Sequence, residues 1–377
     1  MVAHFGERVN LLNICLDNLS KKELLTRLGH GGIVVTPNVD HLMKLQKDPE
    51  FHQVYRKSDY VVCDSKILFY ASRVLGQPIQ EKISGLDLFP AFYEYYKHDE
   101  NVTIFLLGGT PISVQLAKRK INQKVGRNMV VGVYSPPFGF ENYVNENEKI
   151  VALINRSEAT TLAVGLGVPK QEKWIYKYKE QLPYIKTLLP IGATINFESG
   201  HIARYRKWMS EVGLEWMYRL MSEPRRLWKR YLIEDLPFGW LLMQQLLNRY
   251  EYNLPLGQLL QEADLLSYEQ VEMILAAQAQ QKYRKFGELV VEQGWLQRST
   301  LDFFAEQFPQ LHRKSAKQPL GEYLKAAALL DEKQIHDILW EQSQYGRRFG
   351  EIAVNRGWVP QGTVSLLLGN MNMAQAF

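Results

Sequence analysis

Side chains suited to hydrogen bonding and to base catalysis directly follow two apolar, strand-like runs of the chain. Thr36, Asn38 and Asp40 come after the first run, and together they could hydrogen-bond a sugar or a base. Asp64 comes after the second run, where a partly desolvated carboxylate can take a proton from a hydroxyl group. Asn38 and Asp64 are equally suited to capping the helices that follow them, because their oxygens accept hydrogen bonds from helix N-terminal N–H groups. The residue pattern alone leaves both interpretations open.

Two glycine-containing turns have the properties of an anion-binding site. Glycine lets backbone N–H groups approach a phosphate, and the positive end of the helix after each turn favours negative charge. Neither turn is a Walker loop or a complete G-x-G-x-x-G. A tight turn that binds nothing, with Lys170 and Glu172 simply solvated, would have the same sequence. The candidate anion-binding residues are Gly108, Gly109, Gly165, Gly167 and Lys170.

The segment 215–232 interleaves basic and aromatic residues. Helical spacing puts Arg219, Arg226 and Arg230 on one face, provided that Pro224 does not divide the helix. The strand ends carry no D-x-D pair and the histidines lack metal-ligand spacing, so we expect neither a metal nor a cofactor. A departing phosphate group would then have to be neutralised by arginines, lysines and helix N-termini.

The elements that must position these residues form an alternating series. From about residue 9 to residue 200, continuous Val/Ile/Leu runs are each followed by a helical pattern. Such a series predicts an α/β fold, a Rossmann-like doubly wound and mainly parallel sheet with helices on both faces. Ligands of such sheets bind beyond the carboxyl ends of the strands, which is where the candidate residues other than the arginines are found.

Beyond residue 250 the sequence changes to short helices with an internal repeat. Four glycines, Gly257, Gly287, Gly321 and Gly350, mark two related blocks. We therefore predict an α/β domain at 1–200, a basic aromatic helical appendage at 201–250 and an all-helical repeat domain at 255–377. The halves of the repeat domain are expected at 255–308 and 319–370, with 312–319 as the linker.

Composition limits the location of the protein. The 377 residues carry a net charge of +5 and only two cysteines, which suits a reducing cytoplasm and excludes a disulfide framework. The sequence start has no signal-peptide pattern, and no run of about 18 apolar residues indicates a membrane-spanning helix. We expect a cytoplasmic protein.

The motifs, in their order, resemble those of the WecG/TagA/CpsF family of glycosyltransferases. The resemblance rests on Thr-Pro-Asn-x-Asp at 36–40, Asp64 at a strand end, LLGG, GLGVPKQEKWI, GATINFESG and GLEWMYRLMSEPRRLWKRYL, and it covers about residues 7–235. One departure is visible, because Cys63-Asp64-Ser65 stands where family members commonly read Ala-Asp-Gly. The carboxylate is nevertheless retained.

The resemblance implies an inverting, metal-independent transfer of a sugar, N-acetylmannosamine or a related hexose, from a UDP-sugar to a lipid-pyrophosphate-linked N-acetylglucosamine. It implies that Asp64 is the general base. The resemblance further implies that this transfer is a step in the synthesis of a bacterial surface polysaccharide or a teichoic-acid-like polymer. The implied substrate contacts are Thr36, Asn38, Gln171, Arg219, Arg226 and Arg230, and the implied nucleotide contacts are Gly108, Gly109, Gly165, Gly167 and Lys170.

The same resemblance implies peripheral association with the inner face of the cell membrane through 215–232. Its arginines would bind the lipid pyrophosphate, and Trp216, Trp228 and Tyr231 would settle at the bilayer interface. The alternative is that 215–232 forms a solvated surface helix without a binding role, whose aromatic side chains pack on the sheet domain. The segment 255–377 resembles the N-terminal modules of MshE-type ATPases, which implies binding of cyclic di-GMP or docking of a protein partner.

Two other functions fit the sequence less well. An NAD-dependent oxidoreductase is disfavoured, because no strand end carries G-x-G-x-x-G with an acidic residue about 20 positions later. A nucleic-acid-binding protein is disfavoured, because the basic segment is short and follows no nucleic-acid-binding module.

Overall fold

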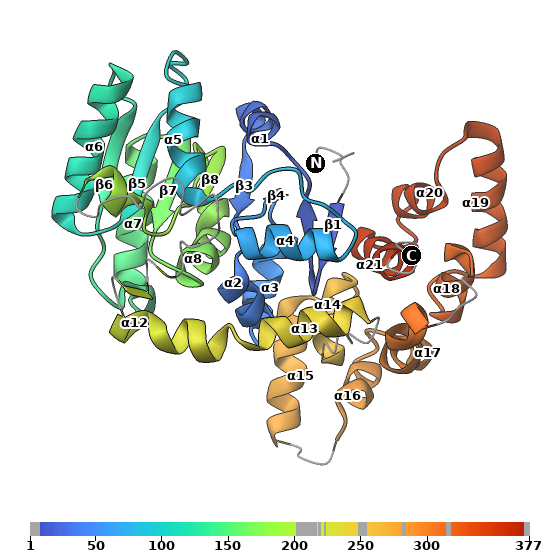
Figure 1. The fold of residues 1–377 in the computed structure, drawn as a ribbon. Coiled ribbons are helices and arrows are strands. Elements are labelled where there is room, and N and C mark those ends of the chain that lie inside the picture. The colour runs from blue at the N-terminus through green and yellow to red at the C-terminus, as the bar shows by residue number, and fades with distance from the viewer. Residues whose placement is uncertain are drawn as a thin grey trace. The chain divides into compact units, whose positions relative to one another are not determined.

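The computed structural model describes residues 8–200, 217, 220–221, 224–247, 255–280, 284–313 and 318–372. The chain divides into two compact units, Met1–Leu247 (unit 1) and Asn248–Phe377 (unit 2). Unit 1 contains a parallel sheet covered by helices, and the described part of unit 2 contains only helices (Figure 1). This architecture confirms the predicted fold class.

The main sheet of unit 1 has six parallel strands in the order β4-β3-β8-β7-β5-β6. Its strands are β3 (Gly32–Val35), β4 (Tyr60–Val61), β5 (Ile104–Gly108), β6 (Val130–Tyr134), β7 (Thr161–Gly165) and β8 (Thr187–Pro190). An antiparallel hairpin of β1 (Arg8–Leu11) and β2 (Ile14–Asp17) precedes them. The alternating series did not predict β6 or the hairpin.

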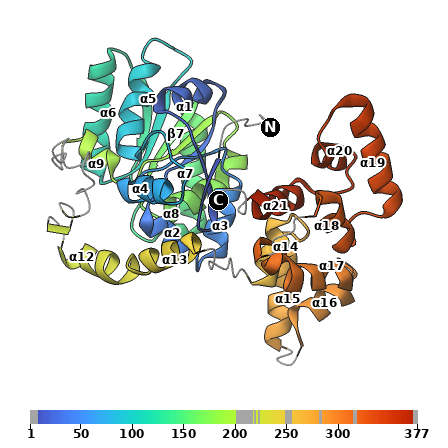
Figure 2. The same ribbon diagram turned by 45° about the vertical axis from the view of Figure 1, so that its right-hand side comes forward.

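Helices cover both faces of the sheet, as the Val/Ile/Leu strands require (Figures 1 and 2). Alternate residues of β5 point to opposite faces: Leu106 belongs to one core and Phe105 to the other. The first core is completed by α1 (Lys21–Arg27), α5 (Gly85–Tyr95), α6 (Pro111–Val125) and α9 (Thr194–Glu198). The second is completed by α7 (Val144–Arg156) and α8 (Lys170–Tyr178). Three further helices follow β3 and β4, namely α2 (Val39–Leu45), α3 (Pro49–Arg56) and α4 (Lys66–Val74).

The strand order creates a switch point between β5 and β7. From β5 the chain runs through α6 to β6 on one side, whereas from β7 it runs through α8 to β8 on the other side. Adjacent parallel strands whose connections leave in opposite directions open a crevice at their carboxyl ends. Gly108 and Gly165 are register partners at this point.

The last described segment of unit 1 runs along the sheet domain as α12 (Pro224–Lys229), the π-helical η4 (Arg230–Glu234) and α13 (Pro237–Leu246). Two contacts anchor α13. Phe238 is buried, and the Gln245 amide accepts from the Leu12 N–H at 2.9 Å and donates to the Asn10 carbonyl at 3.2 Å. One end of α13 is therefore tied to the β1–β2 hairpin.

The helices of unit 2 repeat one pattern four times. Four seven-residue helices begin at the predicted repeat starts: α14 (Leu256–Glu262), α16 (Phe286–Glu292), α18 (Leu320–Ala326) and α20 (Phe349–Asn355). Each is followed by a residue with positive φ, respectively Asp264, Gly294, Ala328 and Gly357. The second helices are α15 (Tyr268–Gln280), α17 (Arg298–Asp302, continued by η5, Phe303–Gln307, and η6, Phe308–Arg313), α19 (Glu332–Tyr345) and α21 (Gln361–Asn372).

Two hydrogen bonds join the halves of unit 2 reciprocally. The Thr300 hydroxyl donates to the Ala327 carbonyl at 2.8 Å, and the Thr363 hydroxyl donates to the Ala263 carbonyl at 2.6 Å. Each half thus contributes one buried threonine to the other. Half of the predicted linker, 314–317, lies outside the described residues.

Candidate active site

The turns after β3 and β4 lie together at the carboxyl edge of the sheet. The Asp64 N–H donates to the Pro37 carbonyl at 3.0 Å, so the predicted hydrogen-bonding residues and the candidate base occupy neighbouring positions. Thr36 is buried, and the Asn38 side chain accepts from the His41 N–H at 3.3 Å. Asn38 therefore does cap α2, which leaves its amide N–H groups as the part able to contact a substrate.

Asp64 does not cap the helix that follows it. Ser65 occupies the N-cap position of α4, and its hydroxyl accepts from the Leu68 N–H at 3.1 Å. The capping interpretation of Asp64 is therefore wrong. Its half-buried carboxylate stands at the strand end, where a general base would need to be.

The glycine turns meet at the switch point, and only glycine fits there. Gly108 has a φ of +117°, and a Cβ at this residue would lie 2.3 Å from the Gly165 carbonyl oxygen. A Cβ at Gly165 would lie 2.6 Å from the Gly192 carbonyl oxygen. The Gly109 N–H also donates to the Gly165 carbonyl at 3.3 Å. The ends of β5, β7 and β8 are thus packed backbone to backbone, and α6 begins directly after the first turn.

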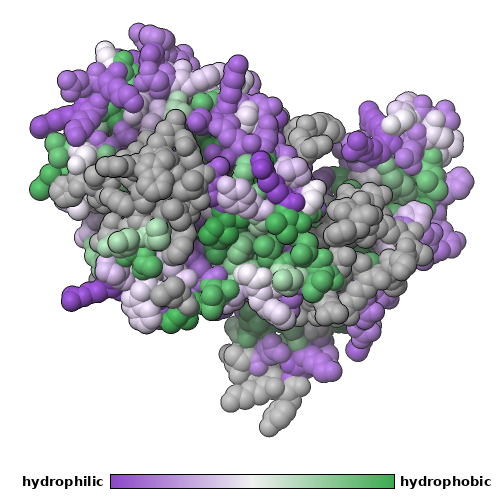
Figure 3. All heavy atoms as spheres, viewed as in Figure 1, coloured by the Kyte–Doolittle hydropathy of each residue, from purple (hydrophilic) through white to green (hydrophobic). Residues whose placement is uncertain are grey.

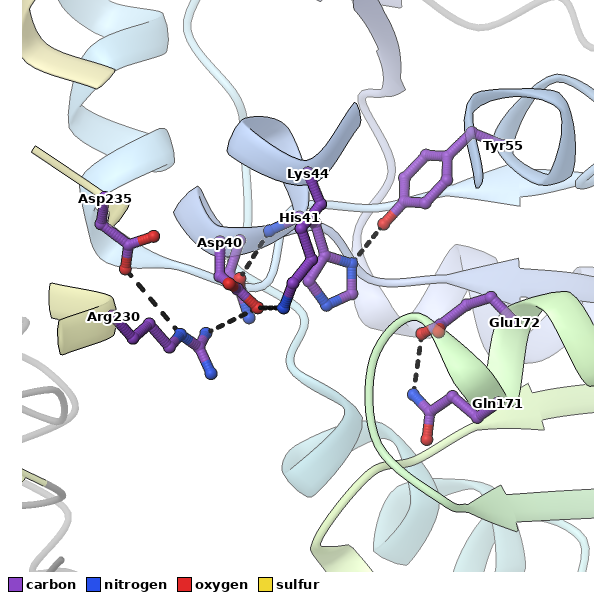
Figure 4. A network of polar contacts seen from close by, with 9 residues as sticks. Asp40, His41, Lys44, Tyr55, Gln171, Glu172, Arg230 and Asp235 are labelled. Atoms are coloured by element: carbon purple, nitrogen blue, oxygen red, sulfur yellow. Dashed lines mark hydrogen bonds and ion pairs between the residues drawn. The ribbon is translucent and has the colours of Figure 1, made fainter. Parts of the chain in front are cut away.

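Gln171 and Glu172 form a buried pair behind these turns (Figure 4). The Gln171 Oε1 atom accepts from the N–H groups of Gly167 and Gly192, at 3.3 and 3.1 Å. Its Nε2 atom donates to Glu172 at 2.8 Å, so the Gln171 amide joins the two turns. Glu172 is not solvated, contrary to the simpler interpretation of its sequence context; burial raises the pKa of its carboxyl group to about 7.

Lys170 points toward the loop between β6 and α7. It forms an ion pair with Glu141, and its ammonium group lies 5.1 Å from the centroid of the Phe138 ring. The other predicted nucleotide contacts, at the glycine turns, lie at the strand ends themselves. Lys170 is therefore held at the rim of the crevice.

A network of buried charges links the first turn of α2 to η4 (Figure 4). Asp40 is only 2% exposed, and its Oδ2 atom lies 2.6 Å from Lys44 Nζ and 3.4 Å from Arg230 Nη2. Arg230 also approaches Asp235 at 3.9 Å. Burial raises the pKa of Asp235 to about 6. Arg230 Nε and Asp235 Oδ1 are buried without a hydrogen-bond partner among the described atoms, so this network has capacity for further contacts.

Beside the network, His41 and Tyr55 hydrogen-bond each other in a buried position. Burial lowers the pKa of His41 to about 3, although the adjacent Asp40 opposes this shift. The pKa of Tyr55 is raised well above its usual value by burial and by the nearby carboxylates of Glu172, Asp64 and Asp40. Both rings are therefore neutral groups beneath the carboxylates of the site.

The comparison with known proteins decides the family of this chain. A sequence model of the glycosyl transferase WecG/TagA/CpsF family matches residues 9–252, well over half of the chain. The chain belongs to this family. The matched range contains every candidate site residue, so the WecG/TagA/CpsF assignment applies to unit 1.

Two relatives from Bacillus share the name N-acetylglucosaminyldiphosphoundecaprenol N-acetyl-beta-D-mannosaminyltransferase. The one from Bacillus spizizenii is 27% identical over 203 residues, which cover 54% of this chain and 75% of the relative. The one from Bacillus subtilis is 27% identical over 217 residues, which cover 58% of this chain and 80% of the relative. The matched family region reaches only the first five residues of unit 2, 248–252, so the resemblance of unit 2 to MshE-type modules stays a prediction.

The predicted arginine face of this WecG/TagA/CpsF enzyme is only partly described. Arg219 and the side chain of Arg226 lie outside the described residues. Arg230 is described, and its guanidinium group is directed into the buried network. α12 begins at Pro224, which therefore occupies the first turn of this helix.

Sequence reasoning did not identify Glu172 as part of the site, and it did not identify the pairing of Asp40 with Arg230. For Glu172 a signal existed, because Ile175 marks the buried face of α8 and Glu172 lies three residues before it. For the pairing of Asp40 with Arg230 there was no signal, since Arg230 comes from a distant segment.

Proposed function

We propose that this enzyme transfers N-acetylmannosamine or a related hexose from a UDP-sugar to the N-acetylglucosamine of a polyprenyl-pyrophosphate-linked acceptor. The names of the two Bacillus relatives support the acceptor and the type of sugar. The observation that carries the proposal is the carboxylate of Asp64 at the carboxyl edge of the sheet, next to a separate residue that caps α4.

In the proposed reaction Asp64 takes the proton of an acceptor hydroxyl while that oxygen attacks the anomeric carbon of the donor. A new carbon–oxygen bond forms as the bond between the anomeric carbon and the phosphate oxygen breaks, and UDP leaves with the electron pair. Attack opposite to the leaving group inverts the anomeric configuration. We assign Thr36 and Asn38 to hydrogen bonds with the substrates at this edge.

The crevice between β5 and β7 is our proposed site for the nucleotide. Its turns present backbone N–H groups, and the N-terminus of α6 lies beside them. The backbone around Gly108 and Gly165 is packed so closely that neither residue could carry a side chain, so no side chain from these two positions fills the crevice. We propose that two of the predicted phosphate ligands, Arg219 and Arg226, offset the negative charge of the departing UDP without a metal ion.

The proposed acceptor is a membrane lipid, so the enzyme must reach a bilayer. Among the described residues, no helix is long and apolar enough to cross one. We propose peripheral association with the inner face of the cell membrane.

Gln171, whose side-chain oxygen accepts hydrogen bonds from the turns at Gly167 and Gly192, is proposed to shape the sugar pocket.

One experiment tests the proposal. The full-length protein is incubated with UDP-N-acetylmannosamine and a short-chain lipid-pyrophosphate-N-acetylglucosamine, with and without a chelator, and release of UDP is followed. We expect release that depends on the acceptor and is unaffected by the chelator. Absence of release with this donor and with other UDP-hexoses would contradict the proposed reaction, whereas inhibition by the chelator would contradict metal independence alone.

A further inference from the structure

Two helices of unit 1 display large apolar side chains on their exposed faces. On α4, Ile67, Tyr70 and Val74 are 43%, 48% and 60% exposed, and their spacing places them on one face. The opposite face of α4 packs into the domain through Leu68 and Phe69. The exposed face is therefore fixed in position.

On and beside α13, four apolar side chains recur at intervals of four, three and four residues. Leu236, Trp240, Met243 and Leu247 are 72%, 67%, 49% and 55% exposed. This spacing defines one helix face, and Gln245 and Phe238 hold the helix to the domain. The apolar face is consequently presented outward by a helix that is already anchored.

The two faces form one region. Figure 3 shows apolar side chains gathered over α4 and α13 on one side of the molecule, and Figure 2 shows these helices close together from a second direction. Contiguous exposed apolar patches are uncommon on soluble monomers and mark binding surfaces. We propose that this α4–α13 surface, made of the seven side chains above, lies on the anionic lipid bilayer that holds the acceptor.

Charge favours an anionic bilayer as the occupant. α4 contains two basic residues and no acidic ones, and α13 contains no charged residue. The cationic groups of Lys66 and Arg73 lie 4.6 and 4.4 Å from the centroid of the Phe69 ring, at the border of the apolar face. Basic groups beside exposed apolar and indole side chains are the composition of helices that lie in a membrane interface.

The basic character continues along α12, and the two acidic residues that precede Leu236 each lie near a basic side chain. Arg225 and Lys229 are exposed on α12, as is Trp228. Glu234, two residues before Leu236, lies 3.9 Å from Lys229. Asp235, directly before Leu236, lies 3.9 Å from Arg230. The border of the α4–α13 surface therefore presents positive charge to anionic head groups.

The position of this surface connects it with the proposed function, on which the choice of bilayer rests. α4 begins two residues after Asp64, and the segment that leads into α13 is tied to Asp40 through Arg230. A bilayer that touches both helices lies next to the carboxyl edge of the sheet. The pyrophosphate of a lipid-anchored acceptor then emerges beside the candidate base.

The test measures co-sedimentation of the full chain with phosphatidylcholine vesicles, with and without phosphatidylglycerol. We expect binding that requires phosphatidylglycerol, weakens with added salt, and falls at least about tenfold in the Trp240→Gln/Met243→Gln variant, which loses two side chains that would be buried in lipid. The matched control is Ile112→Gln, at a residue 68% exposed on α6, which should bind like the wild type. Equal unfolding midpoints show that all proteins are folded.

Activity separates this inference from the proposed function. With a short-chain acceptor in solution the Trp240→Gln/Met243→Gln variant should turn over like the wild type, and with a vesicle-embedded acceptor it should be at least about tenfold slower. Unchanged vesicle binding by the variant overturns the inference. A wild type that ignores vesicles but self-associates through these residues overturns it too, in favour of a second copy. Failure of all turnover contradicts the reaction and leaves the binding result to decide the surface.

Discussion

The guanidinium group of Arg230 lies 3.4 Å from the carboxylate of Asp40, and this ion pair joins the helical appendage to the turn that follows β3. Asp40 is almost fully buried, and Lys44 is its second cation. This ion pair therefore holds the appendage at the carboxyl edge of the sheet, where Arg230 helps to neutralise the buried charge of Asp40.

This pairing predicts coupled effects on stability. We expect Arg230→Gln to lower the free energy of unfolding by about 1–3 kcal/mol, because Asp40 loses a partner in a buried position. The variants Asp40→Asn and Arg230→Gln should be non-additive, with a coupling energy of about 0.5–3 kcal/mol in denaturant titrations. Arg225→Gln, on the exposed face of α12, serves as the control and should change stability little. Additive effects of the two variants would show that the pair contributes nothing.

The adjacent residues Asp64 and Ser65 should separate catalysis from helix capping. Asp64→Asn removes the proposed base, so turnover should fall by about 10²–10⁴-fold. Ser65→Ala removes the α4 cap, and the free energy of unfolding should fall by about 0.5–2 kcal/mol while the chemistry continues. Steady-state kinetics and urea unfolding of both variants distinguish the roles. Normal turnover by Asp64→Asn would show that another group is the base.

Glu172 should make stability depend on pH. Its pKa is raised from 4.5 to about 7 by burial, so between these values the unfolded chain loses this proton while the folded protein keeps it. Its contribution to stability is therefore fully present below pH 4.5 and is lost as the pH rises toward 7. Glu172→Gln should gain stability relative to the wild type across this window, by up to about 3 kcal/mol. Urea midpoints at several pH values check this, and a difference that does not vary with pH would contradict it.

His41 should change the free energy of unfolding with pH in the opposite direction to Glu172. Because burial lowers its pKa from 6.5 to about 3, the unfolded chain binds a proton below pH 6.5 that the folded protein does not. Its effect is a loss of stability as the pH falls from 6.5 toward 3. The wild-type profile combines both groups, so only the difference between Glu172→Gln and the wild type isolates Glu172.

The buried threonines of unit 2 predict a matched pair of effects. Thr300→Val and Thr363→Val keep the side-chain shape but leave the carbonyls of Ala327 and Ala263 without their hydroxyl donors. Each should lower the free energy of unfolding by about 1–3 kcal/mol. Thermal or chemical unfolding of the two variants should give similar losses, since the contacts are equivalent. An effect confined to one of them would mean that the halves are not equivalent in energy.

Much of the fold could be predicted from the sequence, because buried parallel strands read as continuous apolar runs. β6 did not stand out, since it is an edge strand with four half-buried residues, and Gly132 interrupts its pattern where the Phe105 ring leaves no room for a side chain. The hairpin was also missed, since its strands are short and partly polar.

The strand-end residues of the site could be predicted for a geometric reason. Parallel strands bring their carboxyl ends to one edge, so residues distant in sequence, such as Gly108 and Gly165, must meet there. The pairing of Asp40 with Arg230 could not be predicted, because it depends on how η4 packs on α2. Whether Asp64 or Ser65 caps α4 also had to be seen, since both residue types are good caps.

The two threonine contacts of unit 2 also limit how this part of the chain can evolve. In an open array each repeat leaves a free end on which another can stack. Here the first half receives a donor from the second and gives one back, so neither half ends in an unused surface at these contacts. A third copy of the repeated half, inserted between the two, would separate the threonines from the carbonyls to which they donate. The module is therefore expected to vary through its loops and its exposed second helices, while its repeat number stays constant.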